Sequence, residues 1–96
     1  GIIDTLFRQA DGSWVVMDYK TSYVPGGDRD PAAFAVHARH YALQLGIYAE
    51  AAFAQLGVVP ETQIHYVRYT QTVTIPESAW RPVLERSLFE RIEALV

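Results

Sequence analysis

Two apolar segments joined by a glycine turn limit the folds open to this chain more than any other feature of its sequence. Residues 2–8 and 14–21 are rich in β-branched and aromatic side chains, and Ala10-Asp11-Gly12 lies between them. This pattern predicts a β-hairpin. Both segments carry apolar side chains on both faces, which is typical of strands that are covered on two sides. We therefore expect the hairpin to lie inside a layered fold.

The rest of the chain alternates helix and strand signals. Asp30-Pro31 is typical of a helix start and Gly57 of a helix end. Proline is disfavoured inside a helix, so the last helix is expected to begin near Pro82. The predicted elements are a hairpin over 2–21, a loop over 22–30, a long helix from about 31 or 36 to 56, a strand over 62–69, a short strand over 71–75 and a helix from about 82 to 95. This order predicts an α/β fold whose central mixed sheet, the hairpin plus one or two further strands, is flanked by the long helix and the C-terminal helix.

Gly46 lies inside the predicted long helix. A glycine there costs roughly 1 kcal/mol of helix stability relative to alanine. We expect another part of the backbone to approach the helix closely at this residue.

Composition limits the function classes. A chain of 96 residues, half of them hydrophobic and a fifth charged, predicts one small globular domain. The absence of cysteine excludes disulfides, a thiolate zinc site and an iron–sulfur cluster within these residues. No apolar run approaches the ~18 residues of a membrane span. A net charge of −3 argues against nucleic-acid binding by bulk charge, so such a contact would be local, metal-assisted or shared with another domain.

The informative polar residues lie on the predicted hairpin. Asp18 and Lys20 are two residues apart, so their side chains share one face of a strand with Trp14 and Val16. Such a pair can be an ordinary surface ion pair, worth ~0–1 kcal/mol. It can equally be a reactive pair, because the neighbouring side chains on this face are apolar.

The turn decides whether Asp4 joins this pair. A three-residue loop closed by a left-handed Gly12 places Asp4 opposite Asp18, whereas a two-residue turn pairs Asp4 with Tyr19. We favour the longer loop, because Gly12 then stands where a positive φ is needed. Two opposed carboxylates repel each other, so a proton, Lys20 or a cation must hold them together. Oxygen ligands without cysteine or a nearby histidine pair favour Mg²⁺ or Mn²⁺ over zinc.

Gln44 and Tyr48 form a second polar pair. They are four residues apart and share one face of the predicted long helix, and Tyr41 and His37 continue that stripe. Side chains of this kind also occur at the edge of a core with their polar tips in water. The pair therefore indicates a functional site only in combination with the polar residues of the hairpin.

Together these motifs resemble the PD-(D/E)xK nuclease superfamily, most closely its RecB-like exonuclease branch at the C-terminus of AddA-type and RecB-type helicase–nucleases. The three motifs occur in the family order within the first half of the chain. They are Gly1-Ile2-Ile3-Asp4, Asp18-Tyr19-Lys20-Thr21 and Gln44-x-x-x-Tyr48. The resemblance implies a truncated restriction-endonuclease-like core.

The resemblance also implies roles for single residues. Asp4 and Asp18 would bind the divalent metal, Mg²⁺ or Mn²⁺, and the backbone carbonyl of Tyr19 would be a further ligand. Lys20 would orient the attacking water and stabilise charge on the scissile phosphate. The pair Gln44 and Tyr48 would position the nucleic-acid backbone or support the site.

The same resemblance implies the setting of the domain. It predicts a metal-dependent DNA exonuclease in the bacterial cytoplasm, attached to a helicase in the same polypeptide and serving double-strand-break repair with a second subunit. Three alternatives stay open. They are an AddB-like or related CRISPR-associated nuclease with an iron–sulfur cluster, which the lack of cysteine disfavours, a non-catalytic module that binds DNA or a partner protein, and a plain α/β interaction domain.

The beginning of the chain departs from the family pattern. The chain opens at Gly1, where the family has an upstream helix and strand, and the RecB-like branch draws an additional histidine ligand from that region. We therefore expect a fragment of a longer protein, of uncertain activity and metal binding by itself, whose uncovered sheet edge favours self-association. His37 and His40 are interpreted as facing solvent or phosphate, and His65 as structural.

Overall fold

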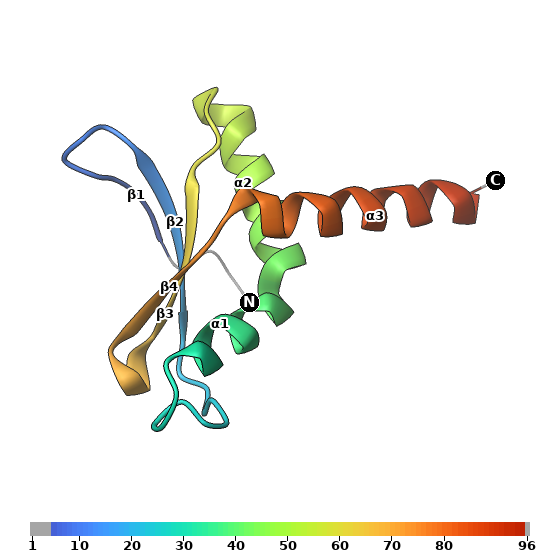
Figure 1. The fold of residues 1–96 in the computed structure, drawn as a ribbon. Coiled ribbons are helices and arrows are strands. Elements are labelled where there is room, and N and C mark those ends of the chain that lie inside the picture. Colours follow the sequence, from blue (N-terminus) through green and yellow to red (C-terminus); the bar gives the residue numbers. More distant parts are fainter. Residues whose placement is uncertain (1–4, 96) are drawn as a thin grey trace.

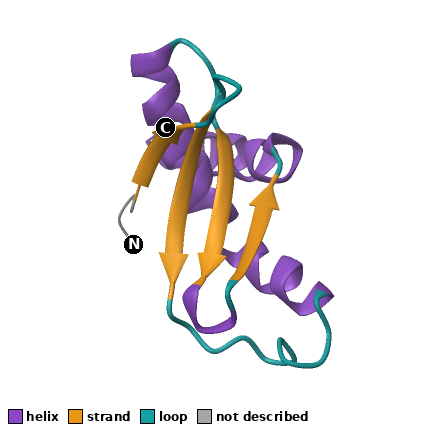
Figure 2. Ribbon diagram, turned by 90° about the vertical axis from the view of Figure 1, so that its left-hand side faces the viewer, coloured by secondary structure: helices purple, strands orange, loops and turns teal. Residues whose placement is uncertain are grey.

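A mixed four-stranded sheet forms the centre of the computed structural model, which describes residues 5–95 (Figure 2). Strand β1 pairs antiparallel with β2, β2 parallel with β3, and β3 antiparallel with β4. The strands, in their spatial order, are β1 (Thr5–Arg8), β2 (Trp14–Lys20), β3 (Glu61–Tyr66) and β4 (Gln71–Ile75). The predicted α/β fold, with the hairpin and two further strands in one mixed sheet, is confirmed.

The helices lie on one side of this sheet (Figure 1). Helices α1 (Ala32–Ala38) and α2 (Ala42–Leu56) connect β2 to β3, as a parallel pair requires, and α3 (Glu77–Leu95) follows β4. The prediction of one continuous helix to Leu56 is wrong, because a 3₁₀ turn over Arg39–Tyr41 separates α1 from α2. The two helices have different partners: α1 contacts β4, whereas α2 contacts α3. The turn allows each helix its own direction.

The hairpin has the predicted three-residue loop. The Gln9 N–H donates to the Ser13 carbonyl at 2.7 Å, the Gly12 N–H donates to the Gln9 carbonyl at 2.9 Å, and Gly12 has a φ of +90°. The strand register runs from Thr5 opposite Met17 to Arg8 opposite Trp14. This is the register on which the predicted pairing of Asp4 with Asp18 depends.

The described part of the hairpin is covered on both faces at Val15 and Val16, which are both 0% exposed, and is open further along β2. Side chains that alternate with the covered ones lie on the side of the sheet away from the helices. On that side Tyr19, Thr72 and Thr74 are exposed to solvent. The expectation of cover on both faces therefore holds at Val15 and Val16 and is wrong for the end of β2 at Tyr19.

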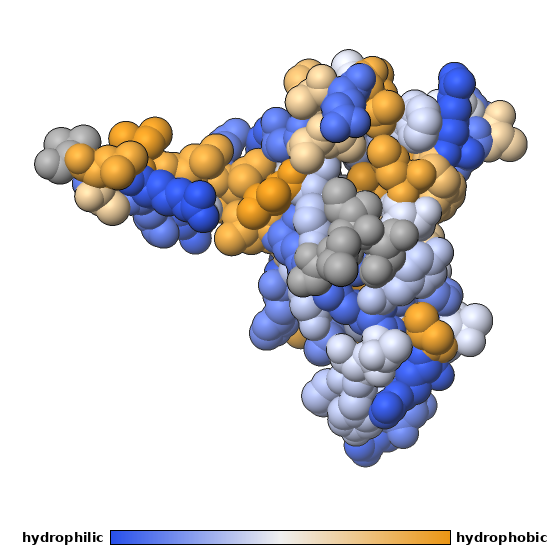
Figure 3. All heavy atoms as spheres, turned by 180° about the vertical axis from the view of Figure 1, so that it is seen from behind, coloured by the Kyte–Doolittle hydropathy of each residue, from blue (hydrophilic) through white to orange (hydrophobic). Residues whose placement is uncertain are grey.

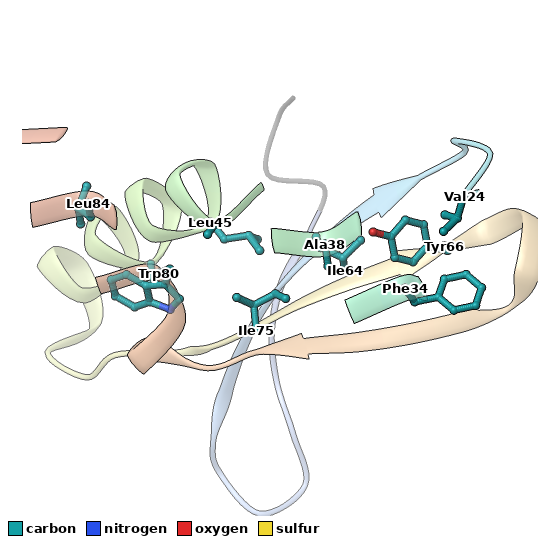
Figure 4. Packing of buried hydrophobic residues seen from close by; sticks show 11 residues of the cluster. Val24, Phe34, Ala38, Leu45, Ile64, Tyr66, Ile75, Trp80 and Leu84 are labelled. Atoms are coloured by element: carbon teal, nitrogen blue, oxygen red, sulfur yellow. The ribbon is translucent and has the colours of Figure 1, made fainter. Parts of the chain in front are cut away.

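The core lies between the helices and the sheet (Figure 4). Its largest buried side chains come from α1, α2, β3 and α3, and include Phe34, Leu45, Ile64, Tyr66 and Trp80. Another element does approach closely at Gly46, but the expectation that its backbone does so is wrong, because the neighbour is a side chain. A Cβ added at Gly46 would lie 2.9 Å from Cε3 of Trp80.

Two predicted boundaries were wrong. Helix α3 begins at Glu77, and Pro82 lies inside it. The Pro76 carbonyl accepts from the N–H groups of Ala79 and Trp80, and burial of Trp80 holds this first turn in place despite the proline. Strand β3 ends at Tyr66, three residues early, because a 3₁₀ turn over Val67–Tyr69 turns the chain into β4.

The C-terminal half of α3 extends away from the rest of the molecule (Figure 1), and apolar side chains are visible along it in the space-filling view (Figure 3). The apolar side chains of this helix fall into two groups: Leu84 is buried, whereas Leu88, Ile92 and Leu95 are exposed together with Phe89. Among residues 5–95, none of the helices combines the length and apolar character needed to cross a membrane.

Candidate functional site

Asp18 and Lys20 form an ion pair on β2 in which the carboxylate is buried and the lysine is partly buried. The Lys20 Nζ lies 3.0 Å from the Asp18 Oδ2, and the Asp18 side chain is 2% exposed. In the sheet, Asp18 is opposite Ile64 and Lys20 is opposite Tyr66, and both neighbours belong to the core. The predicted shared face is therefore the face that packs against the helices. Removing one member of a buried pair leaves an uncompensated charge, so this pair differs from an exposed one.

The Tyr41 ring, from the 3₁₀ turn, is a second partner of the Lys20 ammonium. The Lys20 Nζ lies 4.1 Å from the centre of the Tyr41 ring, a distance at which an ammonium is attracted to an aromatic face. The ammonium thus lies between a carboxylate and a ring. This position is fixed by two elements that are far apart in the sequence.

Tyr66 and His37 extend the polar cluster. The Tyr66 hydroxyl lies 2.9 Å from the His37 Nδ1. Burial of Tyr66, with smaller contributions from Tyr41 and Asp18, raises its pKa to about 12, so the phenol keeps its proton. Burial of His37, together with the nearby His40 and Lys20, lowers the pKa of the imidazole. At neutral pH both rings are therefore uncharged.

The predicted pair on α2 is in contact. The Gln44 Nε2 donates to the Tyr48 hydroxyl at 2.9 Å.

Tyr19 is 44% exposed on the open face of the sheet, where its ring packs edge-on against His65 with ring centres 5.8 Å apart. His65 also lies 2.8 Å from the Thr72 hydroxyl through its Nδ1. Only the backbone carbonyl of Tyr19 enters the predicted ligand set, and that role stays a prediction.

Asp4, the other predicted carboxylate, lies outside the described residues, as does the rest of the first motif. Among residues 5–95, no three histidine, cysteine or acidic residues are grouped closely enough to hold a metal ion. The described part of the predicted set is the Asp18 carboxylate and the Tyr19 backbone. These oxygen donors suit a hard divalent cation, and a complete site needs ligands from beyond them.

Sequence reasoning missed the roles of two aromatic residues. Tyr41 was noted only as part of a helical stripe, and Tyr66 was not singled out. The strand alternation contained a signal for Tyr66, because a buried tyrosine opposite Lys20 needs a partner for its hydroxyl. No signal in the sequence showed that Tyr41 would reach Lys20, because the 3₁₀ turn that places it was not predicted.

Comparison with known proteins places these residues in context. The family model described as the PD-(D/E)XK nuclease superfamily matches residues 1–96. An ATP-dependent helicase/nuclease polypeptide of Lysinibacillus sphaericus (strain C3-41) is 37% identical over 68 residues, which cover 70% of this chain and 6% of that protein. The chain thus spans a small part of the length of the relative it matches. No solved structure matches the chain significantly.

Proposed function

The chain belongs to the PD-(D/E)XK nuclease superfamily, and on this premise we propose that it is a metal-dependent deoxyribonuclease domain that hydrolyses phosphodiester bonds as an exonuclease. The ion pair of Asp18 and Lys20 carries the proposal. A carboxylate and an ammonium held 3.0 Å apart in a core are costly to bury, and a nuclease needs both groups at one place.

The proposed site would hold one hard cation, Mg²⁺ or Mn²⁺. The carboxylates of Asp4 and Asp18 and the carbonyl of Tyr19 would bind it. When bound, such an ion lowers the pKa of a water molecule and polarises the phosphodiester. Lys20 would orient the attacking water and stabilise negative charge on the scissile phosphate.

The supporting residues would act on the substrate and on the lysine. Gln44 and Tyr48, which are hydrogen-bonded to each other, would position the DNA backbone. Tyr41 would keep the Lys20 ammonium in place when a cation occupies the Asp18 carboxylate, because the ring is a second partner for the same charge.

We propose that the domain works within a larger enzyme. The related protein from Lysinibacillus is named as one subunit of a helicase/nuclease, and the matched region is 6% of it. By this similarity the domain would follow a helicase in the same polypeptide and, with a second subunit, process double-strand breaks during recombination in the bacterial cytoplasm. The net charge of −3 suits a domain that receives its DNA strand from an attached motor.

The alternative function is a non-catalytic module that binds DNA or a partner protein. The two functions differ in whether Asp18 is needed for cleavage.

The test is the variant Asp18→Ala in the full-length protein. We expect Mg²⁺-dependent cleavage of DNA to fall to background while ATP hydrolysis continues, because the variant removes a metal ligand and leaves the motor unchanged. The matched control is Asp28→Ala, which removes an exposed acidic residue of the loop before α1. Nuclease activity that survives in Asp18→Ala would refute the catalytic role and favour the non-catalytic alternative.

A further inference from the structure

A pocket of about 320 Å³ lies between α1 and the loop that precedes it. Two histidines of neighbouring helical turns, His37 and His40, line one side, with their ring centres 6.0 Å apart. Pro25 and Val36 contribute apolar walls, and Val36 is 64% exposed. The volume is at the lower end of the range of ligand pockets, which suits one small flat group.

The pocket is connected to the proposed catalytic lysine by ring contacts. The Lys20 ammonium lies on the face of Tyr41, and the Tyr41 ring centre is 5.7 Å from that of His37. His37 in turn lines the pocket. A strand whose phosphate is bound at Lys20 would therefore have its neighbouring nucleotide within reach of the pocket.

The His37 ring, which links Lys20 to the pocket, is fixed by contacts with Tyr66. The buried Tyr66 lies 2.9 Å from the His37 Nδ1, and the two rings pack edge to face with centres 5.5 Å apart. A ring fixed in this way is a stable surface for stacking. His40 is exposed, so it can adjust to a ligand.

The chemistry of the pocket favours a base over a phosphate. Asp30 lines it with a carboxylate, which repels anions, and the Asp30 Oδ1 is held there by the N–H of Ala32 at 3.0 Å. Apolar walls and aromatic rings are the surroundings in which proteins stack unpaired bases. The lowered pKa of His37 agrees with this, because a neutral imidazole offers a flat face and no charge to a phosphate.

We propose that this pocket, between His37, His40 and Val36, binds one unpaired base of the DNA strand next to the phosphate that is cleaved. The proposal rests on the proposed nuclease function and deepens it, because it makes single-stranded DNA the substrate. A paired base cannot enter the pocket without leaving its partner.

The test measures binding of single-stranded oligonucleotides by the full-length protein in the presence of a chelator, with fluorescence anisotropy as readout. One abasic nucleotide is moved along the oligonucleotide position by position. We expect the Kd to rise about 5-fold or more at one position, the value of a lost stacking contact, and to change little elsewhere. The variant His40→Ala should raise the Kd of the intact oligonucleotide similarly. It should raise the Kd no further when the abasic nucleotide is at the sensitive position.

Two further variants separate stacking from other effects. His40→Phe keeps a ring without a proton donor and should retain the affinity of the unchanged protein. His65→Ala, on the opposite face of the sheet, should leave the Kd unchanged. Equal Kd values for all abasic positions, or an effect of His40→Ala that adds fully to the abasic effect, would overturn the pocket as a base site.

Cleavage of the same oligonucleotides in Mg²⁺ distinguishes failure of the base-site proposal from failure of the proposed nuclease function. Cleavage without a sensitive abasic position would refute the base site and leave the nuclease function standing. A sensitive position without any cleavage would refute the nuclease function and leave the base site standing.

Discussion

At the scale of single residues, Lys20 shows how a reactive group is kept in place. A partly buried ammonium needs compensation, and Lys20 obtains it from the Asp18 carboxylate at 3.0 Å and from the Tyr41 ring at 4.1 Å. The carboxylate is the partner that a bound cation would compete for. The ring is the partner that remains, so Tyr41 is a positioning residue for the proposed reaction.

Replacement of Tyr41 tests this role. We expect Tyr41→Phe to keep most of the nuclease activity, because the ring face is retained, and Tyr41→Leu to lower kcat several-fold, in line with a cation–π contact of about 0.5–2 kcal/mol. The measurement is the kcat and KM of both variants on one oligonucleotide. Equal losses in the two variants would show that the hydroxyl, and not the ring face, is what matters.

The partly buried imidazole of His37 predicts how stability depends on pH. Its pKa is lowered in the folded protein by burial, His40 and Lys20, so the unfolded chain binds a proton at a higher pH than the folded chain does. His37 therefore contributes stability above its unfolded pKa of about 6.5, and this contribution is lost as the pH falls below that value.

We expect the free energy of unfolding, measured by urea titration, to decrease between pH 7 and pH 5. The variant His37→Gln should have a smaller decrease, because it has no proton to bind. The control His65→Gln should keep the slope of the unchanged protein. A slope that is the same in His37→Gln and in the unchanged protein would contradict this assignment.

At the scale of elements, Gly46 is where α2 and α3 meet. The Trp80 ring that lies over it is 1% exposed and belongs to the core, so it has little room to move. Close packing of this kind lets the crossover helices and the last helix share one core (Figure 4). The glycine weakens α2 locally and permits the contact between the helices.

The substitution Gly46→Ala has two opposing effects. Alanine favours the helix by about 1 kcal/mol, but its Cβ would overlap the Trp80 ring, and such overpacking costs about 1–3 kcal/mol. Because the ring is confined, we expect a net loss of stability of about 1 kcal/mol, measured by chemical denaturation. In a Trp80→Phe background the same substitution should cost less, since the smaller ring leaves space. An equal cost in both backgrounds would show that the ring is not the cause.

The element boundaries also show which local signals were decisive. Gly12 and Gly57 have positive φ values at the turn and the helix end where the sequence predicted them. Asp30 accepts a hydrogen bond from the Ala32 N–H, as expected of a residue that begins a helix. The prediction that the last helix begins near Pro82 was wrong. Proline removes one hydrogen bond from a helix, but burial of Trp80, two residues earlier, offsets that cost.

At the scale of the whole molecule, α3 leaves part of its apolar side without cover among the described residues. Leu88, Phe89, Ile92 and Leu95 are 51–87% exposed and lie on the part of the helix that extends from the body (Figure 3). Strands β1 and β4 are the edges of the described sheet. Exposed apolar stripes and open edges both favour association.

We expect the 96-residue chain to self-associate, with a sedimentation coefficient that rises with concentration. The double variant Leu88→Glu/Ile92→Glu should reduce the association, because it places charges in the stripe on α3. The matched control Val36→Glu, on α1, should not reduce it. A single monomeric species at every concentration would contradict the prediction, and association unaffected by the double variant would point to the sheet edges instead.

The sequence by itself determined the features that depend on neighbours along the chain. Turn chemistry at Gly12 fixed the register of the hairpin, and strand alternation placed Asp18 and Lys20 on one face, because both rules act over a few residues. The tertiary structure decided what surrounds that pair. Only packing could bring Tyr41 to Lys20, Tyr66 to His37 and Trp80 to Gly46, because these contacts join elements whose relative positions depend on how the whole core fills its space.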